Sequence, residues 1–521
     1  MIKFETNRLF KILTIFTIVG GLLFALRGKI GQPNVDQLLT KSWQENGPFE
    51  LSPEKGRFAL TYSLIENHSV IFTPQLGRFV TPDLGYKNGK YVSLFAPGVS
   101  VLTAPGYLLG SLFGAPQLGT YFVVTLFAIG NTYLLYKLAR LFNLGLYPSL
   151  IGALTFLFAT PAYAYAVNLY QHHISTFLIL LALNLAFTAR HWFSVTMIWF
   201  LCAMSIPIDY PNLFLMMPIG IYSLKYLYSF PSNHKFIKIN WMRTLSLLSV
   251  LVPLSLFMWF NYASYDNPFQ LSGTVASVGR IDESGLPASP EDKIATPDEQ
   301  VFANPENQKK SALNFFKTRN LINGFYTHLL SLDRGILSFT PIIFFTLFGF
   351  RYLFKKNSSY TVVIVSVAIS ALLLYSLWGD PWGGWAFGSR YMIPAFAMCS
   401  LASAAIINNF NRSKIVHFLF ATLVIGSVFI NTTGALGTIA TPPQVQVLYL
   451  ESITHKRERY SWDRSLESIQ NGSTKSFLYN SYFHQGVTPF QYYLILSSVI
   501  SLTLVLLLFA NLFSKNGKVS K

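Results

Sequence analysis

Long apolar runs recur along almost the whole chain and are separated by shorter polar segments. About twelve of them reach or approach the roughly 20 residues that a helix needs to cross a bilayer. We predict spans at 10–26, 118–136, 147–166, 173–188, 192–206, 210–228, 245–263, 336–354, 361–378, 392–409, 416–431 and 492–512. The pattern predicts an all-α polytopic membrane protein with a bundle of about twelve transmembrane helices.

The charged residues support one orientation of this bundle. If the N-terminus is cytoplasmic, the inner connections collect lysine and arginine, and every Asp and Glu except Glu5 lies on the outer side. Such an excess of positive charge is typical of cytoplasmic loops. The inner set is Lys137, Arg140, Arg190, Lys225, Lys235, Lys238, Arg243, Arg351, Lys355, Lys356, Arg412, Lys414, Lys515, Lys518 and Lys521. The net charge of +17 is thereby explained by the membrane, and no nucleic-acid partner is expected.

This orientation requires that the apolar segment 94–114 does not cross the membrane. Pro97 and Pro105, each inside an Ala-Pro-Gly triplet, favour a kinked helix in the outer interface. The predicted organisation is then a tail and first helix (1–27), a first outer loop with two interfacial helices (28–116), half of the bundle (117–263), an outer flap loop (264–335), the second half (336–435), another outer loop (436–491) and a last helix with a tail (492–521).

Composition agrees with a membrane protein. Hydrophobic residues make up 52% and charged residues 12% of the chain, and the mean hydropathy is +0.40. A soluble chain of this composition would expose large apolar patches. The two cysteines, Cys202 and Cys399, lie in apolar segments at no metal or redox spacing, so no disulfide framework is expected.

The stretch 51–69 in the first outer loop has the start signals of a helix. Ser52 is the predicted N-cap, Pro53 follows it, and Glu54 lies in the first turn, where the helix dipole favours a carboxylate. Phe58 and Tyr62 recur at helical spacing. We expect an amphipathic helix on the membrane surface that holds Glu54 and Arg57 near lipid headgroups. A purely structural role for Glu54 at the helix N-terminus is an even alternative.

Three more outer segments carry polar residues at the mouths of predicted spans. Ionisable residues there suggest a shared polar cavity. Each segment also has a structural alternative. The aromatic loop 378–391 could be an interfacial belt, Asp209 an ordinary turn residue, and His172 and His173 anchors hydrated by interfacial water. The candidates are His172 and His173, then Asp209, then Asp380, Trp382, Trp385, Arg390 and Tyr391.

Two of these segments resemble motifs of the GT-C superfamily of membrane glycosyltransferases, in its branch of protein O-mannosyltransferases and aminoarabinose transferases. Glu54-Lys55-Gly56-Arg57-Phe58-Ala59 resembles the Asp-Glu-x-Arg-Tyr-Ala that opens the first interfacial helix there, and Arg390-Tyr391-Met392-Ile393-Pro394 resembles Arg-Tyr-x-x-Pro. Two departures are that Glu54 replaces the family's catalytic Asp and that Leu94-Phe95-Ala96-Pro97 lacks its usual lysine. The chain looks most like a poorly characterised bacterial subgroup.

The resemblance implies a GT-C bundle that transfers a sugar, with inversion, from a polyprenyl-phosphate donor to an acceptor hydroxyl of a glycan, lipid or protein. It implies a site on the outer face of a bacterial inner (plasma) membrane. Glu54 is the first choice for the general base, with Asp83 or Asp209 as fallback. Arg390 is the preferred phosphate ligand, with Lys90 as the alternative. Arg57, His172 and His173 would assist or line the acceptor channel, and Asp380, Trp382, Trp385 and Tyr391 would complete the substrate site.

Other functional classes stay open at this point. A transporter or flippase of lipid-linked sugars would also have many spans, but such proteins tend to show internal repeats, and we find none in this sequence. A non-catalytic member of the same fold is a third possibility, because Glu54 replaces the family's catalytic Asp and the usual lysine is missing. No cofactor is certain and no metal-binding motif is present, although outer-loop carboxylates could hold a divalent cation.

Overall fold

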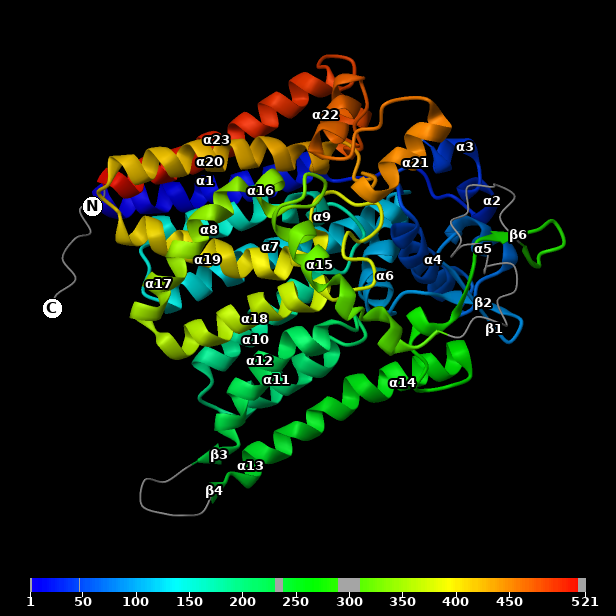
Figure 1. Cartoon of the computed structure of the whole chain (residues 1–521), viewed down its shortest axis with the longest axis horizontal. Helices are drawn as coiled ribbons and strands as arrows, with labels where there is room; N and C mark the ends of the chain where they lie inside the picture. Colours follow the sequence, from blue (N-terminus) through cyan, green and yellow to red (C-terminus); the bar gives the residue numbers. More distant parts are fainter. Residues whose placement is uncertain (1, 46, 230–237, 289–309, 514–521) are drawn as a thin grey trace.

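The computed structural model describes residues 2–45, 47–229, 238–288 and 310–513. Part of the predicted flap (289–309), Lys235 and the tail lysines Lys515, Lys518 and Lys521 lie outside the described residues. Figure 1 shows a bundle of helices lying side by side, with the start of α1 and the last residues of α23 at one end of it. The elements of the first loop gather at the opposite end.

The first part of the chain contains one long helix, the first loop and its small elements. These are α1 (Ile2–Ala25), α2 (Val35–Leu38), α3 (Lys41–Gln44), α4 (Ser52–Glu66), α5 (Pro74–Val80), β1 (Leu84–Lys87), β2 (Lys90–Ser93) and α6 (Gly98–Ser111). β1 pairs antiparallel with β2 and with β5 (Ala276–Val278), so two outer loops far apart in sequence join in one small sheet.

The bundle follows. Its helices are α7 (Pro116–Leu141), α8 (Leu146–Phe158), α9 (Ala162–Ala166), α10 (His172–Thr188), α11 (Trp192–Met204), α12 (Asn212–Ser223), α13 (Trp241–Thr244), α14 (Leu251–Tyr265), α15 (Leu321–Leu329), α16 (Ile336–Phe339), α17 (Thr346–Lys356), α18 (Ser358–Ser376), α19 (Ile393–Asn409), α20 (Lys414–Leu436), α21 (Gln444–Thr454), α22 (Trp462–Gln470) and α23 (Pro489–Phe513). Short hairpins pair β3 (Tyr228–Ser229) with β4 (Lys238–Ile239) and β6 (Arg280–Ile281) with β7 (Pro287–Ala288).

Helix is present in each of the twelve predicted spans, and the predicted all-α polytopic fold class is confirmed. Seven stretches of the described chain are long and apolar enough to cross a membrane: Arg8–Ala25, Pro116–Leu141, Trp241–Tyr265, Ser358–Ser376, Arg390–Asn409, Lys414–Leu436 and Pro489–Phe513. The other five are shorter or interrupted. The turn at Thr160-Pro161 separates α8 from α9, and Pro341 opens a 3-10 helix between α16 and α17.

The helix predicted at 51–69 forms, but it lacks the exposed polar face of the predicted amphipathic helix, because most of it is buried inside the protein. Nine of the fifteen residues of α4 are buried, including Glu54 and Arg57. Phe58 packs against Phe49 with ring centroids 4.7 Å apart, and α4 packs on α5 and α6. The loop around α4 supplies enough apolar partners to enclose the helix, which the sequence pattern of α4 alone could not reveal.

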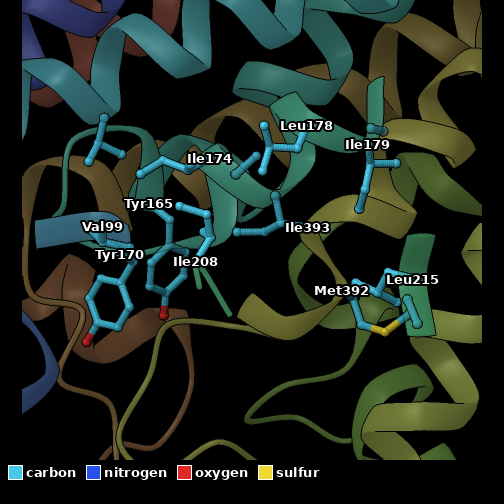
Figure 2. Close-up of a cluster of buried hydrophobic side chains, with 14 of the residues drawn as sticks. Val99, Tyr165, Tyr170, Ile174, Leu178, Ile179, Ile208, Leu215, Met392 and Ile393 are labelled. Carbon is cyan, nitrogen blue, oxygen red and sulfur yellow. The ribbon is translucent and has the colours of Figure 1, made fainter. Parts of the chain in front are cut away.

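The core beside the candidate site joins several helices. Figure 2 shows aliphatic side chains of α10 and α19, among them Ile174, Leu178 and Ile393, packed with Val99 and Ile208. Tyr165 and Tyr170 lie at the edge of this cluster, and both phenol oxygens point away from it. The Tyr165 hydroxyl accepts from the Phe387 amide, and Tyr170 lines the cavity described below, so this cluster backs one wall of the candidate site.

Candidate active site

A cavity of about 450 Å³ opens where α4, the segment before α6, the turn between α11 and α12, and the start of α19 meet. Most of its wall is apolar or aromatic, with Leu94, Phe95, Ile208, Phe214, Phe315, Phe316 and Trp378 among the lining residues. Its polar lining includes Arg57, Tyr170, Gln171, Asp209, Arg390 and Tyr391. The cavity thus combines two cations and one carboxylate with an extended apolar surface.

Arg57 reaches the cavity from the first turns of α4. Its Nη2 donates to Gln171 Oε1 at 2.5 Å and its Nη1 donates to the Pro53 carbonyl at 2.9 Å, whereas Nε has no hydrogen-bond partner. The guanidinium lies over the Phe95 ring, 4.7 Å from its centroid. A side chain at Gly56 would collide with that ring, so the glycine permits the contact. Burial lowers the pKa of Arg57 to about 10, which still leaves it charged at neutral pH.

Arg390 enters the cavity from the turn that opens α19. Its Nη2 donates to the Gly383 carbonyl at 2.7 Å, but its buried Nε and Nη1 atoms have no hydrogen-bond partner. Among the described residues, no carboxylate lies within 4.0 Å of either Arg57 or Arg390. Buried charges are normally paired, so two guanidiniums with unused donors indicate a site for an anion.

Tyr170 lies between the two arginines. The guanidinium carbons of Arg57 and Arg390 are 5.3 Å and 5.1 Å from its ring centroid. The ring also stacks on His172, and both the Tyr170 hydroxyl and His172 Nε2 are buried without a hydrogen-bond partner. The electron-rich ring attracts both cations and so offsets part of the repulsion between them.

Asp209 is the carboxylate of the cavity. Its Oδ2 accepts a hydrogen bond from Gln171 Nε2 at 3.2 Å, and no described residue bonds to Oδ1. Burial raises the pKa of Asp209 to about 6, although the Gln171 hydrogen bond and the charges of Arg57 and Arg390 act in the opposite direction. Asp209 is therefore mostly ionised at neutral pH and close to the range in which a carboxylate accepts protons well.

The loop 378–391 is held in place by hydrogen bonds of Asp380 and Arg334. Asp380 Oδ1 accepts from the Gly383 amide at 3.0 Å, and Gly383 and Gly384 both have positive φ, 73° and 62°, which only glycine adopts without strain. The fully buried Arg334 donates to the carbonyls of Trp382 at 2.9 Å and Gly384 at 2.8 Å. Sequence analysis did not identify Arg334, whose only signal is a cation on the predicted outer side next to Asp333.

Glu54 lies beside the cavity and does not line it. Its Oε2 accepts the backbone amides of Glu50 and Leu51 at 2.9 Å and 3.3 Å, so the carboxylate caps α4, while Oε1 is buried without a partner. Burial raises the pKa of Glu54. The residue that precedes the helix is Leu51, whereas the predicted cap Ser52 donates instead to Asp83 Oδ2 at 2.5 Å.

Several other predicted site residues also lie outside the cavity lining. Lys90 pairs with Asp266 at 3.1 Å on the β1–β2 hairpin. His173 is fixed by Asn131 and by the Ala162 carbonyl, which is 2.7 Å from its Nε2. Trp385 donates to Gln446, and Trp382 contributes its carbonyl to Arg334. The structure therefore brings together Arg57, Asp209, Arg390 and Tyr391, with His172 directly behind Tyr170.

Neither Tyr170 nor Gln171 was among the predicted site residues, although both directly precede His172 in the sequence. The apolar wall also went unrecognised, because the residues named above for it come from four segments that are far apart in sequence. Within the described residues, no group of three or more His, Cys, Asp or Glu side chains could hold a metal ion.

Comparison with known proteins gives structural likeness alone. No protein-family model matches the chain. No curated protein matches it either. Among solved structures, ArnT from Cupriavidus metallidurans in the apo state is similar at 12% identity and a TM-score of 0.48, over 98% of this chain and 78% of that one.

Two further structures are similar at comparable levels. ArnT from the same organism, bound to undecaprenyl phosphate, matches 97% of this chain and 77% of that one at 13% identity and a TM-score of 0.45. The archaeal oligosaccharyltransferase AglB from Archaeoglobus fulgidus, in complex with an inhibitory peptide and a dolichol-phosphate, matches 94% of this chain and 56% of that one at 14% identity and a TM-score of 0.39. At these scores, any inference about function must come from the cavity itself.

Proposed function

We propose that this protein is a membrane glycosyltransferase that moves a sugar from a polyprenyl-phosphate donor to an acceptor hydroxyl, with inversion at the anomeric carbon. The observation that carries the proposal is the pair Arg57 and Arg390, which face one cavity with unused donors and no carboxylate partner. A phosphate monoanion or diester offers oxygens that a guanidinium binds in bidentate fashion.

The rest of the cavity supports an amphipathic donor. A polyprenyl phosphate joins an anionic head to a hydrocarbon chain, and the cavity joins two cations to a wall of Leu94, Phe95, Phe214, Phe315 and Phe316. Because the fold is that of a polytopic membrane protein, such a lipid could enter from the bilayer without crossing water.

Asp209 is our choice of general base, in preference to Glu54 and Asp83. In the proposed reaction, Asp209 removes the proton of the acceptor hydroxyl as its oxygen bonds to the anomeric carbon. The bond from that carbon to the phosphate oxygen breaks, and its electron pair leaves with polyprenyl phosphate. Arg57 and Arg390 stabilise the charge that develops on the leaving phosphate. The ionised Oδ1 of Asp209, which has no partner in the described chain, favours this role.

The orientation is part of the same proposal. Figure 1 shows α4, α21 and α22, which belong to predicted outer loops, away from the end of the bundle where α1 starts. Together with the positive residues of the predicted inner connections, this arrangement favours a site on the outer, periplasmic face of a bacterial inner membrane. The acceptor would then be a glycan, lipid or protein of the cell envelope.

The test uses the full-length protein in nanodiscs with a panel of polyprenyl-phosphate sugars and simple acceptors, following release of polyprenyl phosphate. We expect turnover by the wild type with at least one donor. In Arg390→Gln, we expect turnover to be lost or the affinity for the donor to fall about tenfold to a hundredfold, because one charged hydrogen-bond donor is removed. Binding of every donor without turnover would favour a transporter or a non-catalytic member of the fold. No binding of any donor would overturn the proposal.

A further inference from the structure

Gln171 forms a bridge between the two kinds of charge in the cavity. Its Oε1 accepts from Arg57 Nη2 at 2.5 Å, and its Nε2 donates to Asp209 Oδ2 at 3.2 Å. The side chain is 8% exposed and belongs to the residue that directly precedes α10. Its backbone carbonyl accepts from the Ser175 amide at 2.9 Å, so the first turn of α10 fixes the position from which the side chain extends.

The chemistry of the two neighbours allows one orientation of the amide. A guanidinium can only donate hydrogen bonds, so the Gln171 oxygen must face Arg57. The amide NH₂ then necessarily faces Asp209, whose oxygen accepts. A hydrogen bond donated to a carboxylate favours its ionised form and holds one of its oxygens in place.

We propose that Gln171 is a positioning residue that links the phosphate-binding Arg57 to the carboxylate Asp209 and keeps Asp209 ionised with Oδ1 directed to the acceptor. The inference rests on the proposed function and deepens it. In this proposal, one uncharged side chain connects Arg57, which binds the phosphate of the donor, with Asp209, which takes the proton of the acceptor. Any movement of Arg57 upon phosphate binding would be passed to the carboxylate through this amide.

A hydrogen-bonded bridge and a merely space-filling glutamine differ in their effect on pH dependence. The charged and titratable groups that face Asp209 are the guanidiniums of Arg57 and Arg390 and the phenols of Tyr210, Tyr375 and Tyr391. A methionine at position 171 changes the charge of none of these groups, but it removes the acceptor of Arg57 Nη2 as well as the donor to Asp209. A shift in the acid limb of activity would therefore report the lost bridge between Arg57 and Asp209, whereas loss of a merely space-filling glutamine would leave that limb in place.

The experiment measures kcat/KM against pH for the wild type, Gln171→Met and Gln171→Glu in nanodiscs. Methionine matches glutamine in length but cannot donate, so we expect the acid limb of Gln171→Met to move up by about one pH unit. Gln171→Glu adds a negative charge beside Asp209 and neutralises Arg57. We expect a larger upward shift in this variant, together with weaker binding of polyprenyl phosphate.

Gln117→Met is the matched control. Gln117 is fully buried in α7 and hydrogen-bonded to the Lys29 carbonyl, outside the cavity lining. This variant tests the general cost of losing a buried glutamine, and its acid limb should equal that of the wild type. Thermal unfolding of each variant confirms that folded protein is compared.

The outcomes separate the two proposals. Wild-type turnover with an acid limb that stays in place in both Gln171 variants would overturn the bridging role and leave the glycosyltransferase proposal standing. Absence of wild-type turnover with every donor would overturn the proposed function and, with it, the inference.

Discussion

Two buried clusters of charge meet at the start of α4, where Glu54 belongs to one and Arg57 to the other, and they differ in how their charges are used. In one, Arg27 Nη1 pairs with Glu50 Oε2 at 2.7 Å, and Arg27 Nη2 donates to the carbonyls of Gly434 and Gly437. Glu50 also accepts from the Ile439 amide, and Glu54 caps the helix beside it. In the other, Arg57 and Arg390 face a cavity with donors unused.

The contrast teaches which cluster is structural and which is a site. The Arg27 cluster ties the end of α1 to the end of α20, because the two carbonyls that accept from Arg27 Nη2 lie 407 and 410 residues further along the chain. Arg27 Nε also has no hydrogen-bond partner, but the charge of Arg27 is paired with Glu50. In the cavity, two of the three guanidinium nitrogens of Arg390 have no partner, and no described carboxylate pairs with Arg57 or Arg390. A buried cation that the protein itself does not satisfy must be compensated by solvent or a ligand.

The largest expected effect is the difference in turnover between variants of Asp209 and variants of Glu54. Asp209→Asn keeps the shape of the side chain but removes the base, so we expect turnover to fall about 10²- to 10⁴-fold while donor binding is retained. Glu54→Gln should preserve turnover, because Glu54 acts in capping α4. Measured release of polyprenyl phosphate by both variants checks this, and the reverse pattern would return the base to Glu54.

The next effect is on stability. Arg27→Leu would leave Glu50 buried without its cation, and we expect a loss of about 3–5 kcal/mol in the free energy of unfolding. Arg459→Leu is the matched control, because Arg459 pairs with Asp463 and Glu467 at the surface and its loss should cost about 1 kcal/mol or less. Denaturation of the two variants in the same detergent gives the comparison. Equal losses would contradict the structural role of the Arg27 cluster.

The smallest effect concerns the pH dependence of stability. Burial raises the pKa of Glu54 in the folded state, so the folded protein holds this proton to higher pH than the unfolded chain does. The contribution of Glu54 is fully present below its unfolded pKa and is lost as pH rises through its folded pKa. Glu54→Gln cannot ionise, so its unfolding temperature should fall less over that rise. An identical pH profile in both proteins would show that Glu54 is not desolvated.

Most of the fold and part of the candidate site could be predicted from the sequence. Apolar periodicity located helices at all twelve predicted positions, because membrane spans need long apolar runs whatever their tertiary partners. Arg57, Asp209, Arg390 and Tyr391 were named because each stands at a helix end beside distinctive residues. The burial of α4 could not be predicted, since it depends on packing by α5 and α6 and on the Phe49 ring.

The sequence also could not show which carboxylate caps a helix and which one lines the cavity. Glu54 stands at the position that a family motif favours for catalysis, whereas its side chain turns to the amides of Glu50 and Leu51. Asp209 faces the cavity because the turn between α11 and α12 lies against the start of α6, where the Gly98 amide bonds to the Pro207 carbonyl at 2.7 Å. Such contacts between distant segments leave no local pattern.

The most direct test of the account is the affinity of the wild type for polyprenyl phosphate and for the matching uncharged polyprenol, measured in the same nanodiscs. The two lipids share a hydrocarbon chain, so their difference isolates the phosphate. We expect the phosphate to bind at least tenfold more tightly, and the difference to vanish in the double variant Arg57→Gln/Arg390→Gln. Equal affinity of the wild type for both lipids would contradict the claim that the two arginines form an anion site.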